Sequence, residues 1–391
     1  MRIKVGVIFG GVSVEHEISV ITAVQAMKAI NEEKYEVIPL YIDKERNMYT
    51  GKLLMDMDSY KDMDLLKKYA TRVVLYTQNG HYYLQKLGLF KKNINEIDIA
   101  FPIVHGSGVE DGSLAGYLET IGIPYVGPNV LSAALGQDKV VMKQIFESNN
   151  LPVVDYTWFF DYEYLEDKEL ILEKIKNIGY PVIVKPASLG SSIGITVVHS
   201  ESEIDEAINE AINYDKKILI EKMVQNLTEV NCSVKGVVSD CSTSAVEEVL
   251  SSDEILSFND KYVNGNKSKG MAASVGRIIP ARLSSEALEE IKNLSIKVFR
   301  VLNLSGICRI DYLVDKDTNK IYINEPNTIP GSLSFYLWEP VGIKYTDLLD
   351  QVITTSIREY KKKQRKTFSF DTNILQNFNG LKCGKKGAKK F

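Results

Sequence analysis

The sequence predicts an α/β protein that opens with a doubly wound sheet, and three observations support this fold class. Near the amino terminus, apolar strand patterns alternate with a helical pattern and glycine-rich turns, as expected for parallel strands covered by helices. Later in the chain, YPVIVKPASLGSSIG contains another predicted strand, which a glycine loop follows. Further along, RIDYLV and KIYIN flank the polar cluster DKDTN, which indicates a β-hairpin.

The composition narrows the class of protein. The 391 residues are enough for two or three domains, and 45% apolar with 25% charged residues are ordinary for a globular chain. A net charge of −4 argues against a nucleic-acid partner. Scattered cysteines without C-x-x-C spacing predict a reduced, cytoplasmic protein. No apolar run approaches the roughly 20 residues of a membrane span, and the first residues lack a signal-peptide pattern, so we expect no membrane partner.

The first region, residues 1–127, carries the alternating pattern. KVGVIFGG and YEVIPLYI are predicted strands, and the segment between them has apolar residues at helical spacing. IDIAFPIVH is the next predicted strand; a glycine loop, the helix LAGYLETIGI and the short strand PYVG follow. The ligand crevice of such a sheet lies at the carboxyl ends of its strands.

Two further regions and a tail complete the predicted organisation. Residues 128–215 contain two helices and the strand YPVIVKPA. Residues 216–358 contain the strands ILIEKMV and EVNCSVKGVV, the hairpin, and the amphipathic helix SSEALEEIKNLSIKVFRVL. Within them, residues 251–276 are polar and glycine-studded, which is typical of a functional lid or a disordered loop. Residues 359–391 are lysine-rich and predict a mostly flexible tail, with a peripheral strand around FSFDTNIL as the alternative.

The hairpin carries the most informative side chains. Arg309 and Asp311 share one face of its first strand, and Glu325 and Asn327 share one face of its second. If the turn centres near Thr318, Asp311 lies opposite Glu325. Two facing carboxylates repel each other unless a cation sits between them. Carboxylates and an amide oxygen are hard ligands that suit Mg²⁺ held with nucleotide phosphates, so the hairpin predicts a metal–nucleotide enzyme.

Two kinds of glycine loop are candidate anion sites. Lys185 ends a strand and precedes a loop whose glycines would let backbone N–H groups approach phosphate, although a solvated lysine on a surface turn explains the pattern equally well. FGGVSVEHEIS and HGSGVEDGS each connect a strand to a helix and fit an anion or carboxylate site. Taken singly, Glu15 and Glu110 are better explained as solvated first-turn carboxylates, and His105 as a structural histidine.

Two weaker patterns concern a nucleotide. In EKMVQNLTEV, backbone groups of residues 222–224 would lie at a strand end, suited to reading an adenine edge, with Glu229 near a ribose. A Glu-Lys surface pair explains the same spacing. In the lid, Lys261 would reach phosphates on closure and Tyr262 would order the loop, with a solvated lysine as the simpler explanation.

These motifs, in this order, resemble the D-alanine–D-alanine ligase family of ATP-grasp enzymes over residues 3–358. The resemblance implies a three-domain ATP-grasp architecture with ATP held between the second and third domains. It implies ligation of two D-alanines through a D-alanyl phosphate, for peptidoglycan precursor synthesis. The implied cofactors are ATP and Mg²⁺, with Mn²⁺ as an alternative, and we expect a homodimer.

The resemblance also implies roles for individual residues. It makes Glu15 the residue that holds the ammonium of the first D-alanine, linked to Ser191 and Tyr262. It makes Arg309 and the N–H of Gly331 the pair that stabilises the oxyanion. The remaining roles are phosphate binding by Lys139, Lys185 and Lys261, adenine and ribose contacts by Glu221, Lys222, Val224 and Glu229, and Mg²⁺ ligation by Asp311, Glu325 and Asn327.

The second substrate is less closely defined. Tyr262 favours an amine over a hydroxyl acceptor, since relatives that make D-alanyl-D-lactate tend to lack this tyrosine. In NTIPGSLSFYLWEP, however, Tyr336 takes about the place of the serine that normally binds the second substrate's carboxylate, with Leu337 beside it. The loop HGSGVEDG also has Val109 in place of a glycine. A related ligase with D-serine or D-lactate as acceptor is therefore the alternative. A non-catalytic nucleotide-binding protein is a third hypothesis, opposed by the intact polar set.

Overall fold

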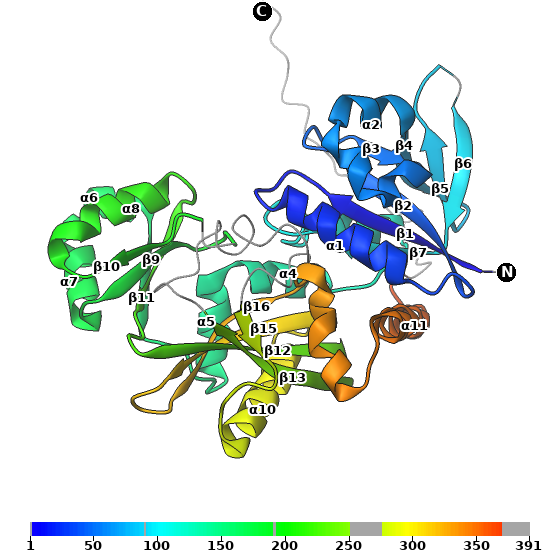
Figure 1. Cartoon of the computed structure of the whole chain (residues 1–391). Helices are drawn as coiled ribbons and strands as arrows, with labels where there is room; N and C mark the ends of the chain where they lie inside the picture. The colour runs from blue at the N-terminus through cyan, green and yellow to red at the C-terminus, as the bar shows by residue number, and fades with distance from the viewer. Residues whose placement is uncertain (1, 90, 191–192, 251–275, 370–391) are drawn as a thin grey trace, which may run out of the picture.

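In the part of the chain that the structure describes, the strands form three β-sheets, each covered by helices (Figure 1). The structure is a computed structural model that describes residues 2–89, 91–190, 193–250 and 276–369. Of the predicted features, Ser191, the lid up to residue 275 and residues 370–391 of the tail lie outside the described residues. Among the described helices, none is long and apolar enough to cross a membrane.

The first sheet has seven strands in the order β6-β5-β4-β3-β2-β1-β7. Its core is the parallel trio β1 (Ile3–Gly10), β2 (Tyr35–Ile42) and β7 (Ile99–Ile103), which is the part of the sheet that the sequence predicts. An antiparallel extension follows: β3 (Met48–Thr50), β4 (Thr71–Gln78), β5 (His81–Lys86) and β6 (Lys92–Ile97). The expected strand PYVG is reduced to a single bridge between Ala100 and Tyr125.

The helices of the first region connect these strands. The long ones follow the glycine loops after β1 and β7, as predicted. They and the shorter turns are α1 (His16–Ala29), η1 (Lys52–Met55), η2 (Met57–Lys61), α2 (Met63–Tyr69) and α3 (Ser113–Ile121). Both loops therefore meet at the carboxyl edge of the parallel strands, where a ligand crevice is expected.

The second sheet has the order β10-β9-β11-β8. Its elements are β8 (Tyr156–Phe160), α6 (Asp161–Glu166), α7 (Lys168–Ile178), β9 (Val182–Pro186), β10 (Thr196–Val198), η3 (Glu201–Glu203), α8 (Ile204–Ile212) and β11 (Lys217–Lys222). The strand β11 pairs with β8 and β9, because its apolar residues join the core of this sheet. The chain thus enters the third sheet after Lys222, later than the predicted boundary at 216.

The third sheet has the order β14-β13-β12-β15-β16. Its strands are β12 (Leu227–Val237), β13 (Asp240–Leu250), β14 (Gly276–Ile278), β15 (Ser305–Asp315) and β16 (Ile321–Asn327), covered by α10 (Ser285–Val301). Two helices from earlier in the chain, α4 (Val130–Gln137) and α5 (Lys139–Ser148), also belong to this layer. Met142 and Phe146 of α5 pack in the same core as Phe299 and Ile310, so residues 128–151 are structurally part of the third unit.

The hairpin has the predicted register. Asp311 lies opposite Glu325, and Arg309 lies opposite Asn327. The pairing shifts by one residue directly beyond, where Tyr312 faces Ile323 and Asn324 is left as the extra residue of a β-bulge. The bulge leaves the four polar residues together on one face.

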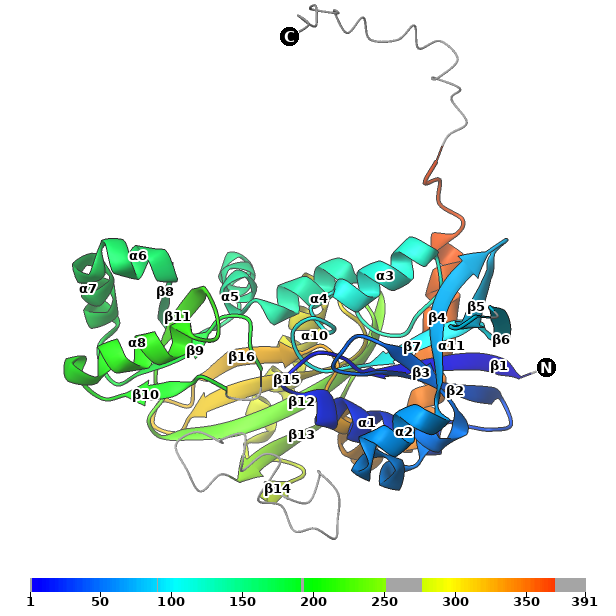
Figure 2. The same cartoon turned by 90° about the horizontal axis from the view of Figure 1, so that it is seen from above.

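The end of the chain returns to the first sheet. After η5 (Gly331–Leu337) and η6 (Glu339–Val341), the helix α11 (Tyr345–Lys363) runs beside that sheet in both views (Figures 1 and 2). Trp338, together with Leu348, Leu349, Val352 and Ile353 of α11, completes the core around β1 and β2. The helix continues past the predicted limit at residue 358, and most of FSFDTNIL lies outside the described residues.

Candidate active site

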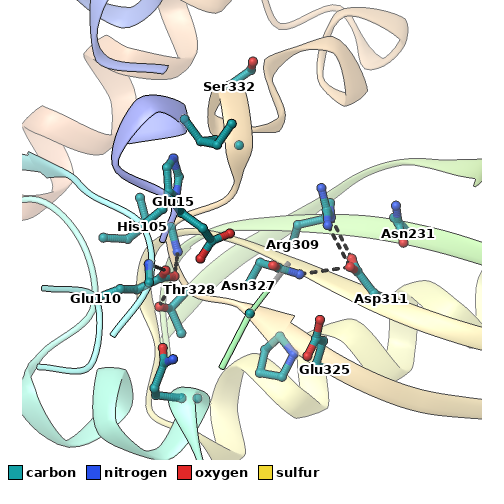
Figure 3. Close-up of a pocket in the computed structure, with 18 of the residues that line it drawn as sticks. Glu15, His105, Glu110, Asn231, Arg309, Asp311, Glu325, Asn327, Thr328 and Ser332 are labelled. Atoms are coloured by element: carbon teal, nitrogen blue, oxygen red, sulfur yellow. Dashed lines mark hydrogen bonds and ion pairs between the residues drawn. The ribbon is translucent and has the colours of Figure 1, made fainter. Parts of the chain in front are cut away.

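A crevice lies where the loops of the first domain face the hairpin of the third (Figure 3). It is lined mainly by polar residues of the first region and of the third sheet, with Lys139 of α5 and Gly190. Those that the sequence predicts are Glu15, Lys139, Glu229, Arg309, Asp311, Glu325, Asn327, Gly331 and Tyr336. Four further lining residues, Glu110, Asn231, Glu247 and Arg277, are not among the predicted site residues.

Glu15 is 9% exposed, and two glycine loops close around its carboxylate. A Cβ atom at Gly106 or at Gly190 would lie 3.0 Å from Oε2 of Glu15. These glycines let both loops approach the carboxylate more closely than any other residue would allow. Ser191 and Tyr262, the expected partners of Glu15, lie outside the described residues.

Glu110 ties the first domain to the strand that leaves the hairpin. It accepts hydrogen bonds from the N–H of Gly106 at 2.9 Å, the hydroxyl of Thr328 at 3.0 Å and the N–H of Ile329 at 3.0 Å. Burial, and then the negative charge of Glu15, raise the pKa of Glu110 to about 7. The sequence favoured a solvated carboxylate here, because nothing local showed that residues 328–329 would cover the loop.

His105, which the sequence favours as a structural histidine, lines the crevice. The side chain is buried, and Nε2 lies 3.2 Å from the hydroxyl of Thr22. Burial lowers the pKa of His105 to about 4, so the ring is neutral at physiological pH.

The polar face of the hairpin forms a charge network in the crevice. Arg309 donates from Nε and Nη2 to the two carboxylate oxygens of Asp311, at 2.6 and 2.7 Å, and Asn327 donates to Oδ2 of Asp311 at 3.0 Å. Burial opposes the charge of Arg309, but Asp311 outweighs it and raises the pKa of the guanidinium above its ordinary value. Lys139 lies 3.1 Å from Glu325. Each of the two facing carboxylates is therefore paired with a protein cation.

The same residues offer a donor set for a metal ion. Within the described residues, no cluster of three or more His, Cys, Asp or Glu side chains is arranged to hold a metal. Two carboxylates and one amide oxygen suit Mg²⁺ only when further oxygens, such as those of phosphates, complete the shell. The amide of Asn327 donates to Asp311, so it would have to turn over to present its oxygen.

A second charge cluster lies between α5 and the second sheet. Glu221 is paired with Lys143, at 2.5 Å, and with Lys185, and all three side chains are buried. Burial alone would raise the pKa of Glu221, but the two lysines outweigh it and lower the pKa to about 2. The carboxylate of Glu221 is thus paired with two lysines. The predicted adenine contact would therefore have to be made by the backbone of Glu221. Lys143 was not predicted, although it follows Lys139 by one helical turn.

The predicted adenine contacts are divided between two places. Lys222 and Val224 line a separate depression together with Asp155 and Tyr322. Lys222 donates to the carbonyl of Gly179 at 2.9 Å. Glu229 lines the main crevice instead, and Lys261 lies outside the described residues.

The segment after the hairpin forms the far end of the crevice. Gly331 and Tyr336 line it, whereas Leu337 is fully buried and its side chain does not reach the crevice. This differs from the expectation that Leu337 sits beside the second substrate. The intervening residues 332–334 have φ values of 51°, 50° and 49°, an unusual left-handed turn for residues other than glycine.

A lysine, hard-oxygen donors and an arginine thus line one crevice of an ATP-grasp fold. Comparison with known proteins agrees with this class. Residues 4–128 match the family model described as D-ala D-ala ligase N-terminus, and residues 145–354 match D-ala D-ala ligase C-terminus. The chain belongs to the D-alanine–D-alanine ligase family.

Individual relatives cover nearly the whole chain. A D-alanine–D-alanine ligase of Thermosipho melanesiensis is 40% identical over 383 residues, which is 98% of this chain and 100% of the relative. The structure of the VanG D-Ala:D-Ser ligase from Enterococcus faecalis has a TM-score of 0.76 at 28% identity and covers 91% of this chain and 100% of its own. That of the D-alanine–D-alanine ligase from Coxiella burnetii has a TM-score of 0.77 at 25% identity, covering 96% and 99%.

Proposed function

We propose that this protein joins two D-alanines into D-alanyl-D-alanine and converts ATP to ADP and phosphate, as a step of peptidoglycan precursor synthesis. The observation that carries the proposal is the composition of one crevice. It combines a buried carboxylate (Glu15), a lysine (Lys139), an arginine (Arg309) and two facing carboxylates. Membership in the ligase family supports the same reaction.

Glu15 holds the ammonium group of the first D-alanine. A carboxylate enclosed by two glycine loops leaves room beside it only for a small group, and an ammonium is the charge that complements it. Ser191 and Tyr262 complete this subsite in the proposal. The carboxylate of the first D-alanine is thereby left as the reacting group.

Phosphoryl transfer comes first. An oxygen of the donor carboxylate attacks the γ-phosphorus of ATP, ADP leaves with the electrons of the broken bond, and D-alanyl phosphate forms. Lys139 and Lys185, with Lys261, neutralise the phosphates, because the attack brings like charges together. Asp311, Glu325 and Asn327 would hold Mg²⁺, with Mn²⁺ as an alternative, and the bound ion would screen the same charge. Lys222, Val224 and Glu229 contact the adenosine.

Peptide-bond formation follows. The amine of the second D-alanine attacks the carbonyl carbon of the D-alanyl phosphate, and loss of the amine proton and of phosphate completes the bond. Arg309 and the N–H of Gly331 stabilise the negative oxygen of the tetrahedral intermediate. Asp311 fixes the guanidinium before the substrates arrive, which avoids a reorientation cost during the reaction.

The direct test is release of phosphate that depends on both ATP and D-alanine, with the dipeptide identified by mass spectrometry. Absence of phosphate release, with D-alanine alone and with every second amino acid supplied, would overturn the proposal. We also propose a cytoplasmic homodimer, which light scattering on the purified protein would test for its oligomeric state.

A second candidate differs in the acceptor. Tyr336 replaces the expected small hydroxyl residue at the acceptor end, and one solved structure of similar fold is a D-Ala:D-Ser ligase. We therefore include D-serine, and D-lactate, as alternative acceptors. Equimolar competition against D-alanine, with the products separated by mass, distinguishes these from the leading proposal.

A further inference from the structure

A group of polar residues lies at the acceptor end of the crevice without a role in the reaction outlined above. Glu247 of β13, Arg277 of β14 and Tyr336 of η5 line the crevice together with Arg309. The guanidinium carbon of Arg277 lies 4.3 Å from the ring centroid of Tyr336, which is a cation–π stacking distance. Three elements thus bring these side chains together beside the oxyanion-stabilising arginine.

Tyr336 cannot replace a serine as the donor to a substrate carboxylate in this arrangement. It has a single hydroxyl proton, and that proton is donated to Oε1 of Glu247 at 3.0 Å. Tyr336 is also surrounded by charge: burial, and then Glu247, raise the pKa of its hydroxyl to about 12, so it stays protonated. The acceptor carboxylate therefore needs another partner.

Arg277 has the unused hydrogen-bonding capacity. Its Nη1 atom is buried but has no hydrogen-bond partner among the described residues. The nearest oppositely charged atom is Oε2 of Glu247 at 3.6 Å, which is too long for a hydrogen bond. A buried guanidinium N–H without a partner is unfavourable, and a bound carboxylate is the group whose geometry matches the fork of an arginine.

Glu247 fixes the position of the arginine. The side chain is 1% exposed, and Oε1 accepts hydrogen bonds from both Asn231, at 2.9 Å, and Tyr336. The carboxylate is thereby held rigidly on one side of Arg277 while the ring of Tyr336 supports its face. The guanidinium is oriented before any ligand arrives, which reduces the entropy lost on binding.

We infer that Arg277 binds the α-carboxylate of the acceptor amino acid, and that Glu247 and Tyr336 act as positioning residues for it. This inference rests on the proposed function, because it assigns the second-substrate subsite of the same reaction. It replaces a neutral hydroxyl contact by a charged one, made through Nη1 of Arg277. The acceptor is consequently required to carry a free carboxylate, whatever its side chain.

The test uses D-alaninamide, which has an amine but no carboxylate and can serve only as acceptor. Full-length protein is given ATP, Mg²⁺, and equal amounts of D-alanine and D-alaninamide, and the two products are quantified by mass spectrometry. We expect wild type to favour D-alanine by about 100-fold, the worth of a charge-assisted pair, and Arg277→Gln to reduce the ratio to near one. A structural defect alone would lower both products equally.

Two further variants keep the test decisive. Arg277→Lys retains the charge but loses the fork, so we expect an intermediate product ratio; this variant decides the test if Arg277→Gln is inactive. Arg282→Gln is the matched control, because Arg282 pairs with Glu248 and its side chain is 64% exposed; its product ratio should equal that of wild type.

The inference and the proposed function fail in different ways. An unchanged product ratio in Arg277→Gln, or in Arg277→Lys if the former is inactive, overturns the inference while ligation continues. If wild type makes no dipeptide with any acceptor, the proposed function is itself wrong. If another D-amino acid proves to be the acceptor, that amino acid and its amide take the place of the alanine pair, with the same expected ratios.

Discussion

Arg309 holds Asp311 by two hydrogen bonds, of 2.6 and 2.7 Å, between residues two apart on the same face of β15. One residue of this pair is proposed to stabilise an oxyanion and the other to bind a metal ion. Two charged groups with separate tasks therefore depend on each other for position. A substitution of either residue should therefore slow both phosphoryl transfer and peptide-bond formation.

Asp311→Asn should lower kcat at least about 100-fold. It removes a carboxylate ligand of the proposed Mg²⁺ and also the negative charge that orients Arg309. The Mg²⁺ concentration needed for half-maximal rate should rise as well. Steady-state rates at several Mg²⁺ concentrations measure both effects. Asp240→Asn, at the exposed start of β13, is the control and should behave as wild type. Unchanged turnover in Asp311→Asn would refute the metal assignment.

Gly190→Ala is a probe of the donor subsite. The three described atoms nearest to the new Cβ all belong to Glu15, the closest at 3.0 Å, so the carboxylate must move aside. We expect the KM for donor D-alanine to rise about tenfold, which corresponds to ~1.4 kcal/mol of lost binding, with little change in melting temperature. Gly116→Ala in α3, where the Cβ would lie 3.9 Å from Val130, is the matched control. Equal donor KM values in both variants would contradict the role of Glu15.

Glu110 should make stability depend on pH. Its pKa rises from 4.5 to about 7 on folding, so its contribution is fully present below pH 4.5 and is lost as the pH rises through 7. Between pH 5 and 8, the free energy of unfolding of wild type should therefore fall by about 3 kcal/mol relative to Glu110→Gln. Urea titrations across this range measure the difference. Glu289→Gln, at an exposed site on α10, should show no such relative change.

Glu221→Gln should destabilise the fold by about 3–5 kcal/mol, because Lys143 and Lys185 then share a buried site without a counter-charge. The double variant Lys143→Met/Glu221→Gln should recover part of this loss, since one of the two uncompensated charges is gone. Urea unfolding of the two single variants and of the double variant gives the coupling free energy between Lys143 and Glu221. A loss below about 1 kcal/mol in Glu221→Gln would show that the cluster is hydrated in solution.

The hairpin could be predicted from sequence because its information is local. Alternation places Arg309 and Asp311 on one face, and the polar turn fixes their partners, so the register of Asp311 with Glu325 followed directly. The bulge at Asn324 was not predicted, because a strand pattern does not reveal an extra residue between two paired positions. The parallel core of the first sheet was predictable for the same local reason.

What sequence reasoning missed depends on contacts between distant segments. Glu110 is buried by residues more than 200 positions away, and β11 belongs to the second sheet only because of its partners β8 and β9. Arg277 lies on the three-residue strand β14. Nothing near it in sequence indicates that its guanidinium stacks on Tyr336. Tyr336 was identified as a departure, but its engagement with Glu247 required the fold.

The return of α11 to the first sheet has a consequence for synthesis. The core around β1 and β2 includes Trp338, Leu348 and Val352, which are made after all the described strands of the other two sheets. At roughly 5–20 residues per second, the first domain waits many seconds with an incomplete core while the rest is translated. The second sheet, whose core is drawn from residues 159–220, has no such delay. The first domain therefore completes its core only after the cores of the two sheets that follow it in the chain.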